Sequence, residues 1–221
     1  MEQDIFAAIS ANDQERVKQL IAADANVAHA RNSAGISALL QARYENKLEI
    51  VDLLRKVATD LDIFESAALG DLPRLRTLLA NDRGQVNARS SDGFTPLHLA
   101  CFFGQVEAAR LLVGQGADAN AVSPARIAVI HSAAASRDAA MLTLVLQAGA
   151  NPNVQQQRGY TALHEAAMHN SVARAKALLE AGADPTIRTE DGLTAEEMAT
   201  REGSKDVAEL LASHKQSAAN G

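Results

Sequence analysis

The chain has 221 residues, a formal net charge of −6 and few aromatic residues, with two Tyr, five Phe and no Trp. A single Cys excludes an intramolecular disulfide and favours a reducing compartment. No stretch approaches the roughly 18 consecutive apolar residues of a membrane span, and the N-terminal stretch lacks the basic start and apolar run of a signal peptide. We therefore expect a cytoplasmic protein that does not bind through a membrane anchor.

The first part of the chain predicts two pairs of short helices. Residues 2–31 and 32–57 each contain two short runs of apolar side chains at helical spacing. Gly35 and Ser37 open the second pair with a turn and an N-cap. The first pair has no opening turn, as expected for an end unit without a predecessor.

The third unit, residues 58–89, breaks the spacing. Asn46 and Gly70 hold equivalent positions at the end of a first helix, yet the stretch of chain between them is shorter than the stretch between such positions in later units. Residues 58–62 contain neither of the turn sequences found elsewhere. We therefore expect one projecting turn to be missing between the second and third units.

The fourth unit, residues 90–121, shows the pattern most clearly. Gly93 suits a tight turn that needs a positive φ. Thr95 can cap the following helix, and Pro96 suits its first position. Gly104 can end this helix in a left-handed conformation. A second amphipathic helix then completes the unit.

Three further units follow this pattern, at residues 122–154, 155–188 and 189–215. In the first of them Arg126 replaces the turn Gly and Ala128 replaces the capping Thr, so we expect an irregular turn there with the helix pair 129–147 intact. In the last, Thr194 and Glu197 predict a capping box.

The end of the chain is acidic. The segment 189–213 holds seven acidic and two basic residues and so carries −5 of the net charge of −6. Glu196 and Glu197 stand where Leu and His stand in earlier units, which marks a C-terminal cap with a polar outer face. No basic stripe is present, so we expect no nucleic-acid binding. Residues 216–221 are small and polar and predict a disordered tail.

The units share one motif. Four segments recur with a period of about 33 residues: Thr95-Pro-Leu-His98, Ala128-Val-Ile-His131, Thr161-Ala-Leu-His164 and Thr194-Ala-Glu-Glu197. A turn, two short helices, this period and a TPLHLA core resemble the ankyrin repeat. The shortened unit before GFTPLHLA resembles small stand-alone bacterial proteins of that family. The resemblance covers nearly the whole chain. It implies an all-α solenoid of about seven helix-turn-helix units with short β-turn fingers and degenerate caps, forming one domain over residues 1–215.

Candidate chemistry is scarce. His98, His131 and His164 recur with the same period, which permits either a metal ladder or a scaffold role. In ankyrin repeats this His bonds to backbone in the neighbouring turn, and stacked units hold equivalent residues too far apart to share a metal. We expect the scaffold role, a packing role for Cys101, and no metal, cofactor or catalytic residue. The turn residues Asn87, Asn120 and Asn153 are expected to be structural, although some eukaryotic ankyrin proteins are hydroxylated there.

The resemblance places several side chains on the concave face where the core does not need them. These candidate partner-binding residues are Tyr44, Leu69, Phe94, Phe102, Phe103, Ile127, Tyr160, Met168 and His169. Phe94 and Tyr160 have the alternative of covering a neighbouring finger. We expect the alanine variants of Phe102 and Phe103 to keep their stability and to lose binding.

An apolar and aromatic strip on a concave face is typical of a protein-binding groove. We therefore expect a monomeric, non-catalytic module that binds a partner protein or peptide. The alternatives are a self-associating structural module and an accessory or inhibitory subunit of an enzyme. The sequence does not name the partner.

Overall fold

The computed structural model describes residues 2–136 and 138–219, and in these residues it contains fourteen α-helices and no β-sheet. The helices are α1 (Glu2–Ser10), α2 (Gln14–Ala23), α3 (Ala38–Tyr44), α4 (Leu48–Arg55), α5 (Ile63–Leu69), α6 (Leu72–Asn81), α7 (Pro96–Phe102), α8 (Val106–Gly114), α9 (Val129–Ala135), α10 (Ala139–Gln147), α11 (Ala162–Met168), α12 (Val172–Glu180), α13 (Ala195–Arg201) and α14 (Lys205–Ala219). The 3-10 helices are η1 (Ala25–His29), η2 (Arg83–Asn87) and η3 (Gln157–Gly159). The predicted all-α fold is confirmed.

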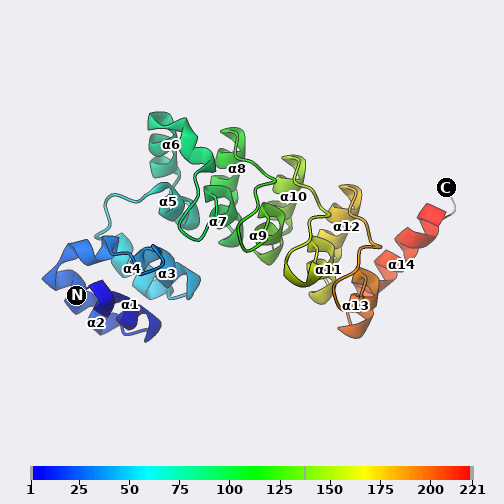
Figure 1. The fold of residues 1–221 in the computed structure, drawn as a ribbon, viewed down its shortest axis with the longest axis horizontal. Coiled ribbons are helices and arrows are strands. Elements are labelled where there is room, and N and C mark those ends of the chain that lie inside the picture. Colours follow the sequence, from blue (N-terminus) through cyan, green and yellow to red (C-terminus); the bar gives the residue numbers. More distant parts are fainter. Residues whose placement is uncertain (1, 137, 220–221) are drawn as a thin grey trace.

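The helices stack as consecutive pairs in two layers. Figure 1 shows α6, α8, α10 and α12 in one row and α7, α9, α11 and α13 in a second row beside it. Within each row, neighbouring helices pack against one another. We call α3, α5, α7, α9, α11 and α13 the inner helices and their partners the outer helices. The result is an open, one-dimensional stack in which each pair contacts its neighbours.

Turn chemistry places the inner helices. In the fourth unit the Gly93 N–H donates to Ser90 O and the Ser90 N–H donates to Phe94 O, both at 2.9 Å, which forms the projecting turn that we call a finger. The Thr95 hydroxyl accepts from the His98 N–H and caps α7. Gly104 follows α7 at a φ of 71°, which L-residues resist.

The finger of the fifth unit is regular, so the expectation of an irregular turn there is wrong. The Ser123 N–H donates to Ile127 O and the Arg126 N–H donates to Ser123 O, both at 2.9 Å. Arg126 takes a φ of 62°, the conformation that Gly93 has in the preceding unit. One left-handed residue costs about 1–2 kcal/mol, which the hydrogen bonds of the finger offset. Helices α9 and α10 form as expected.

The missing finger coincides with a break in the core. The segment between Arg55 and Ile63 forms no finger hydrogen bonds. One buried cluster runs from Ile5 to Leu61 and a second from Ile63 to Leu211. Outer helices α4 and α6 do not pack closely, unlike the other neighbouring outer helices. Figure 1 accordingly shows α1–α4 set apart from the double row.

Other contacts hold the two parts together, and we call this connection the joint. Without an intervening finger, the second finger lies against the fourth, where a Cβ on Gly35 would be 2.9 Å from the Ser91 Cβ. A small buried cluster of Leu40, Ala68 and Leu99 joins α3, α5 and α7. The joint is therefore held at its inner face.

The C-terminal unit ends the stack as a polar cap. Thr194 and Glu197 form the predicted capping box, and the exposed Glu197 carboxylate also accepts from Arg188 Nη1 at 2.8 Å. Helix α14 continues to Ala219, whereas the sequence indicated a tail from residue 216. Helical structure thus replaces most of that tail, and residues 220 and 221 lie outside the described residues.

Candidate binding groove on the inner face

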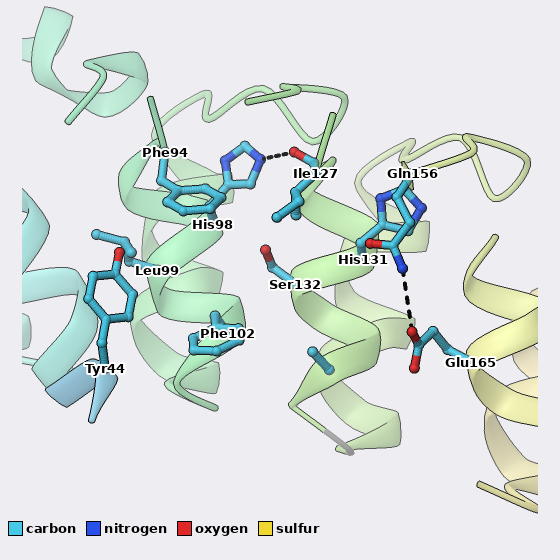
Figure 2. A pocket seen from close by; sticks show the side chains of 11 residues that line it. Tyr44, Phe94, His98, Leu99, Phe102, Ile127, His131, Ser132, Gln156 and Glu165 are labelled. Atoms are coloured by element: carbon cyan, nitrogen blue, oxygen red, sulfur yellow. Dashed lines mark hydrogen bonds between the residues drawn. The ribbon is translucent and has the colours of Figure 1, made fainter. Parts of the chain in front are cut away.

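An open groove with a volume of about 310 Å³ crosses α7, α9 and α11 beneath the fingers. Its apolar lining comprises Tyr44, Phe94, Leu99, Phe102, Ile127 and Ala135. Its polar lining comprises His98, His131, Ser132, Gln156 and Glu165. Figure 2 shows the aromatic side chains toward one end and Glu165 with Gln156 at the other. The groove is thus apolar at one end and acidic at the other.

The depth of the groove comes from small side chains on α9. Ala135 lies one repeat period from Phe102 and one from Met168, so the three hold equivalent positions. Ser132 in the same way stands between Leu99 and Glu165. Larger side chains on α7 and α11 therefore flank a floor of small ones.

Phe102 dominates the apolar end. This residue is 46% exposed and is one of the four exposed large hydrophobic residues among those described. Its ring centroid lies 5.0 Å from that of Phe103 and 6.4 Å from that of Tyr44. Aromatic neighbours thus support the ring while one side stays open to solvent.

Tyr44 comes from α3, across the joint. Its hydroxyl donates to an Asp92 carboxylate oxygen at 3.0 Å. Burial, together with the negative charge of Asp92, raises the pKa of Tyr44, so its phenol stays neutral. Tyr44 therefore adds an uncharged aromatic wall to a groove formed otherwise by later units.

The histidines belong to the scaffold. The His98 Nδ1 accepts from the Thr95 N–H at 3.2 Å, so its Nε2 carries the proton that bonds to Ile127 O at 3.1 Å. His164 bonds in the same way to Leu193 O of the following unit at 3.1 Å, whereas His131 bonds to Val154 O at 2.9 Å, at the end of its own unit. Burial lowers the pKa of His98 to about 4 and lowers the pKa of the other two. The predicted bond to the next turn is confirmed for His98 and His164, while His131 bonds to the chain just before that turn.

Glu165 is the acidic end of the groove. Its side chain is 23% exposed. It accepts a long hydrogen bond of 3.4 Å from Gln156 Nε2 and lies 3.7 Å from His169 Nε2. No ion pair with Lys or Arg is formed by Glu165 among the residues described.

The structure brings four of the nine predicted binding residues together in the groove: Tyr44, Phe94, Phe102 and Ile127. Met168 and His169 are exposed at the end of α11 and do not line the groove. Tyr160 packs against its own unit, with its ring centroid 5.9 Å from that of His164 and 5.9 Å from the Arg158 guanidinium.

Phe103 and Leu69 serve the packing instead. The Phe103 ring packs against the cluster of the joint and lies 4.6 Å from the Arg43 guanidinium. Leu69 packs against the N-terminal core. The expectation that the scaffold does not need these side chains is wrong for both, because Phe103 packs where the second and fourth units meet and Leu69 packs against the preceding units. Tyr44 and Phe94 also pack against the cluster of the joint, although they line the groove as well.

Sequence reasoning missed Ser132, Ala135 and Glu165, whereas Gln156 lies in the stretch 155–157 that the sequence indicated as a polar rim. The aromatic residues drew attention to large side chains, whereas a hollow needs small ones. Alignment of the units by their period would have shown Ala135 opposite Phe102.

The remaining candidate chemistry concerns the cysteine and metal binding. Cys101 is fully buried, and burial raises the pKa of its thiol. In residues 2–136 and 138–219 no group of His, Cys, Asp or Glu side chains is placed to hold a metal ion. Nor is any helix of the described part of the chain long and apolar enough to cross a membrane.

Paired helices, fingers and a regular period define a helical repeat solenoid with a groove on its inner face. The chain belongs to the ankyrin repeat family. The family model for ankyrin repeats (3 copies) matches residues 5–123 and 130–220. Proteins of this family are generally protein–protein interaction modules and are generally non-catalytic.

Relatives share parts of this chain. Alpha-latrocrustotoxin-Lt1a of Latrodectus tredecimguttatus is 31% identical over 86 residues, 35% of this chain and 6% of the toxin. Human ankyrin repeat domain-containing protein 49 is 40% identical over 52 residues, 24% of this chain and 22% of the relative. Human DNA-binding protein RFXANK is 36% identical over 76 residues, 34% of this chain and 29% of the relative. The matches thus cover less than a third of each relative.

Proposed function

We propose that this chain is a non-catalytic module that binds a partner protein or peptide in the groove on its inner face, with Phe102 as the anchor. The observation that carries the proposal is a large aromatic residue, 46% exposed, at the apolar end of a groove. Exposed aromatic residues in such a setting are frequent hot spots of protein interfaces. The general role of ankyrin repeats supports the same conclusion.

The energetics suit an anchor. A Phe side chain offers roughly 200 Å² of surface, so covering the exposed 46% would bury about 90 Å² and contribute about 2 kcal/mol. Tyr44 and Phe103 already hold the ring, so little rotamer freedom is lost on binding. A preorganised groove of this kind binds without rearranging its backbone.

We further propose that the protein is a monomer and acts in the cytoplasm. The name of RFXANK describes that protein as DNA-binding. Here the acidic Glu165 lines the groove, and a carboxylate repels phosphate, so we propose a protein or peptide partner and no nucleic acid.

The test compares Phe102→Ala with Leu48→Ala, which alters an equally exposed residue (48%) on α4, outside the groove. Each variant and the wild type serve as bait in lysate of the source organism, and the affinity for the retained protein is then measured with purified components. We expect Phe102→Ala to weaken binding about thirtyfold, the equivalent of ~2 kcal/mol, and Leu48→Ala to have no effect. Unchanged affinity in folded Phe102→Ala would refute the proposal.

A further inference from the structure

We propose that the occupant of the groove is an extended peptide segment that places a large apolar side chain over Ala135 and a lysine or arginine against Glu165. This inference rests on the proposed function and specifies the chemistry of the partner. It follows from the size of the groove, from its charge and from the spacing of its helices.

The size favours an extended segment over a helix. One turn of α-helix, about 10 Å wide and 5.4 Å long, occupies roughly 400 Å³. The groove holds about 310 Å³, and its lining is divided among side chains of α3, α7, α9 and α11, so it offers room for single side chains and no continuous trough along one helix. A single extended chain, which projects its side chains alternately to opposite faces, can fill it with one or two side chains.

The apolar end suits a large aliphatic or aromatic side chain. Ser132 and Ala135 form a floor of small side chains, and Phe102 and Leu99 stand beside it on α7. A side chain placed on this floor would lie against the open side of the Phe102 ring. It would thereby cover the apolar surface that the fold leaves exposed.

The other end requires a positive charge. Glu165 supplies the carboxylate of the lining, and the bonded His98, His131 and Tyr44 side chains there are neutral. Its side chain is about three quarters covered, and its carboxylate contacts in the described residues are an amide at 3.4 Å and an imidazole at 3.7 Å. A partly desolvated carboxylate without a cationic partner gains from a charge-assisted bond to Lys or Arg.

The helix spacing sets the register of the peptide. Packed helices lie about 8–10 Å apart, so the floor on α9 and Glu165 on α11 are separated by about that distance. Two residues of extended chain span about 7 Å and project their side chains to the same face. A basic side chain two positions from the apolar one therefore reaches the carboxylate. The expected motif is a large apolar residue, any residue, then Lys or Arg, in either chain direction.

A random-peptide library tests this inference. The purified full chain, Glu165→Gln and Ala135→Phe are each used to select peptides, with Glu180→Gln as a matched control on the exposed end of α12. Peptides selected by the wild type should be enriched in the motif. Affinity should fall about tenfold for Glu165→Gln, as for the loss of one partly desolvated charge pair, and should stay unchanged for Glu180→Gln. Ala135→Phe, which fills the floor at an exposed position, should bind none of these peptides.

The outcomes separate this inference from the proposed function. Selected peptides that lose affinity for Phe102→Ala but lack basic enrichment, and bind Glu165→Gln normally, would overturn the inference and leave the proposed function standing. Peptides that bind Phe102→Ala as well as the wild type would refute both. Analytical ultracentrifugation of the wild type and of Glu165→Gln tests whether a second copy of the chain occupies the groove. A wild-type dimer that becomes a monomer in Glu165→Gln would overturn the inference in favour of self-association. Circular dichroism establishes that each variant is folded.

Discussion

Replacing Leu40 by alanine should uncouple the two parts of the solenoid. Leu40 is 4% exposed and, with Ala68 and Leu99, forms the buried cluster that bridges the joint. Truncation of a buried Leu costs about 2–5 kcal/mol, so we take about 3 kcal/mol here. A block of roughly 60 residues is stable by only about 3–9 kcal/mol, judged per residue. The loss is therefore comparable to the whole stability of the block formed by α1–α4.

Urea unfolding followed by circular dichroism, with hydrogen exchange and mass spectrometry to locate the change, measures this effect. We expect an early transition confined to residues 2–61, while the rest of the stack unfolds at the wild-type midpoint. Leu142→Ala, a fully buried position on α10, provides the control and should lower the later transition instead. One cooperative transition with an unchanged m-value in Leu40→Ala would refute the idea that the joint is a weak connection.

Three further predictions concern single side chains. Ser66→Ala should raise the free energy of unfolding in urea by about 1 kcal/mol, because the buried Ser66 hydroxyl has no hydrogen-bond partner in the described residues. Ala already stands at the equivalent position 100 of the next unit, so the smaller side chain fits there. A loss of stability would contradict this prediction. The free energy of unfolding should fall as the pH drops from about 6.5 toward 4. In this range His98 is protonated in the unfolded chain, whereas burial keeps it neutral in the folded protein. The shift of its pKa from 6.5 to about 4 corresponds to ~3 kcal/mol, and an equally steep loss in His98→Gln would contradict the assignment to His98. Cys101 should resist a thiol reagent at pH 8 until urea unfolds the chain, because it is fully buried and burial raises the pKa of its thiol; rapid labelling of the native protein would contradict this burial.

Most of the fold could be predicted from the repeat period. Thr95, Pro96 and Gly104 act through local backbone chemistry, so their roles could be predicted from the sequence. The missing finger was also predictable, because its turn residues are absent between Arg55 and Ile63. Arg126 misled the prediction, since the hydrogen bonds of a finger can hold one Arg in the left-handed region that the sequence pattern reserves for Gly.

The groove was harder to predict than the helices. Phe102 was identified because it is a large aromatic residue at a position that the resemblance places on the concave face, but the joint against which Phe103 packs depends on contacts between units that are not consecutive. A hollow is also a property of several units at once. Ala135 creates a hollow only because larger side chains, Phe102 and Glu165, stand on the neighbouring helices. A motif within one unit does not show this difference in side-chain size between units.

The interrupted core has a mechanical consequence. A pulling force applied between the two ends of the chain loads every interface of the stack in series. The interface between α4 and α6 lacks the outer-helix packing that the others have. Tension would therefore open the stack first at the joint and draw Tyr44 away from Phe102, so one wall of the groove would separate before any helix unravelled.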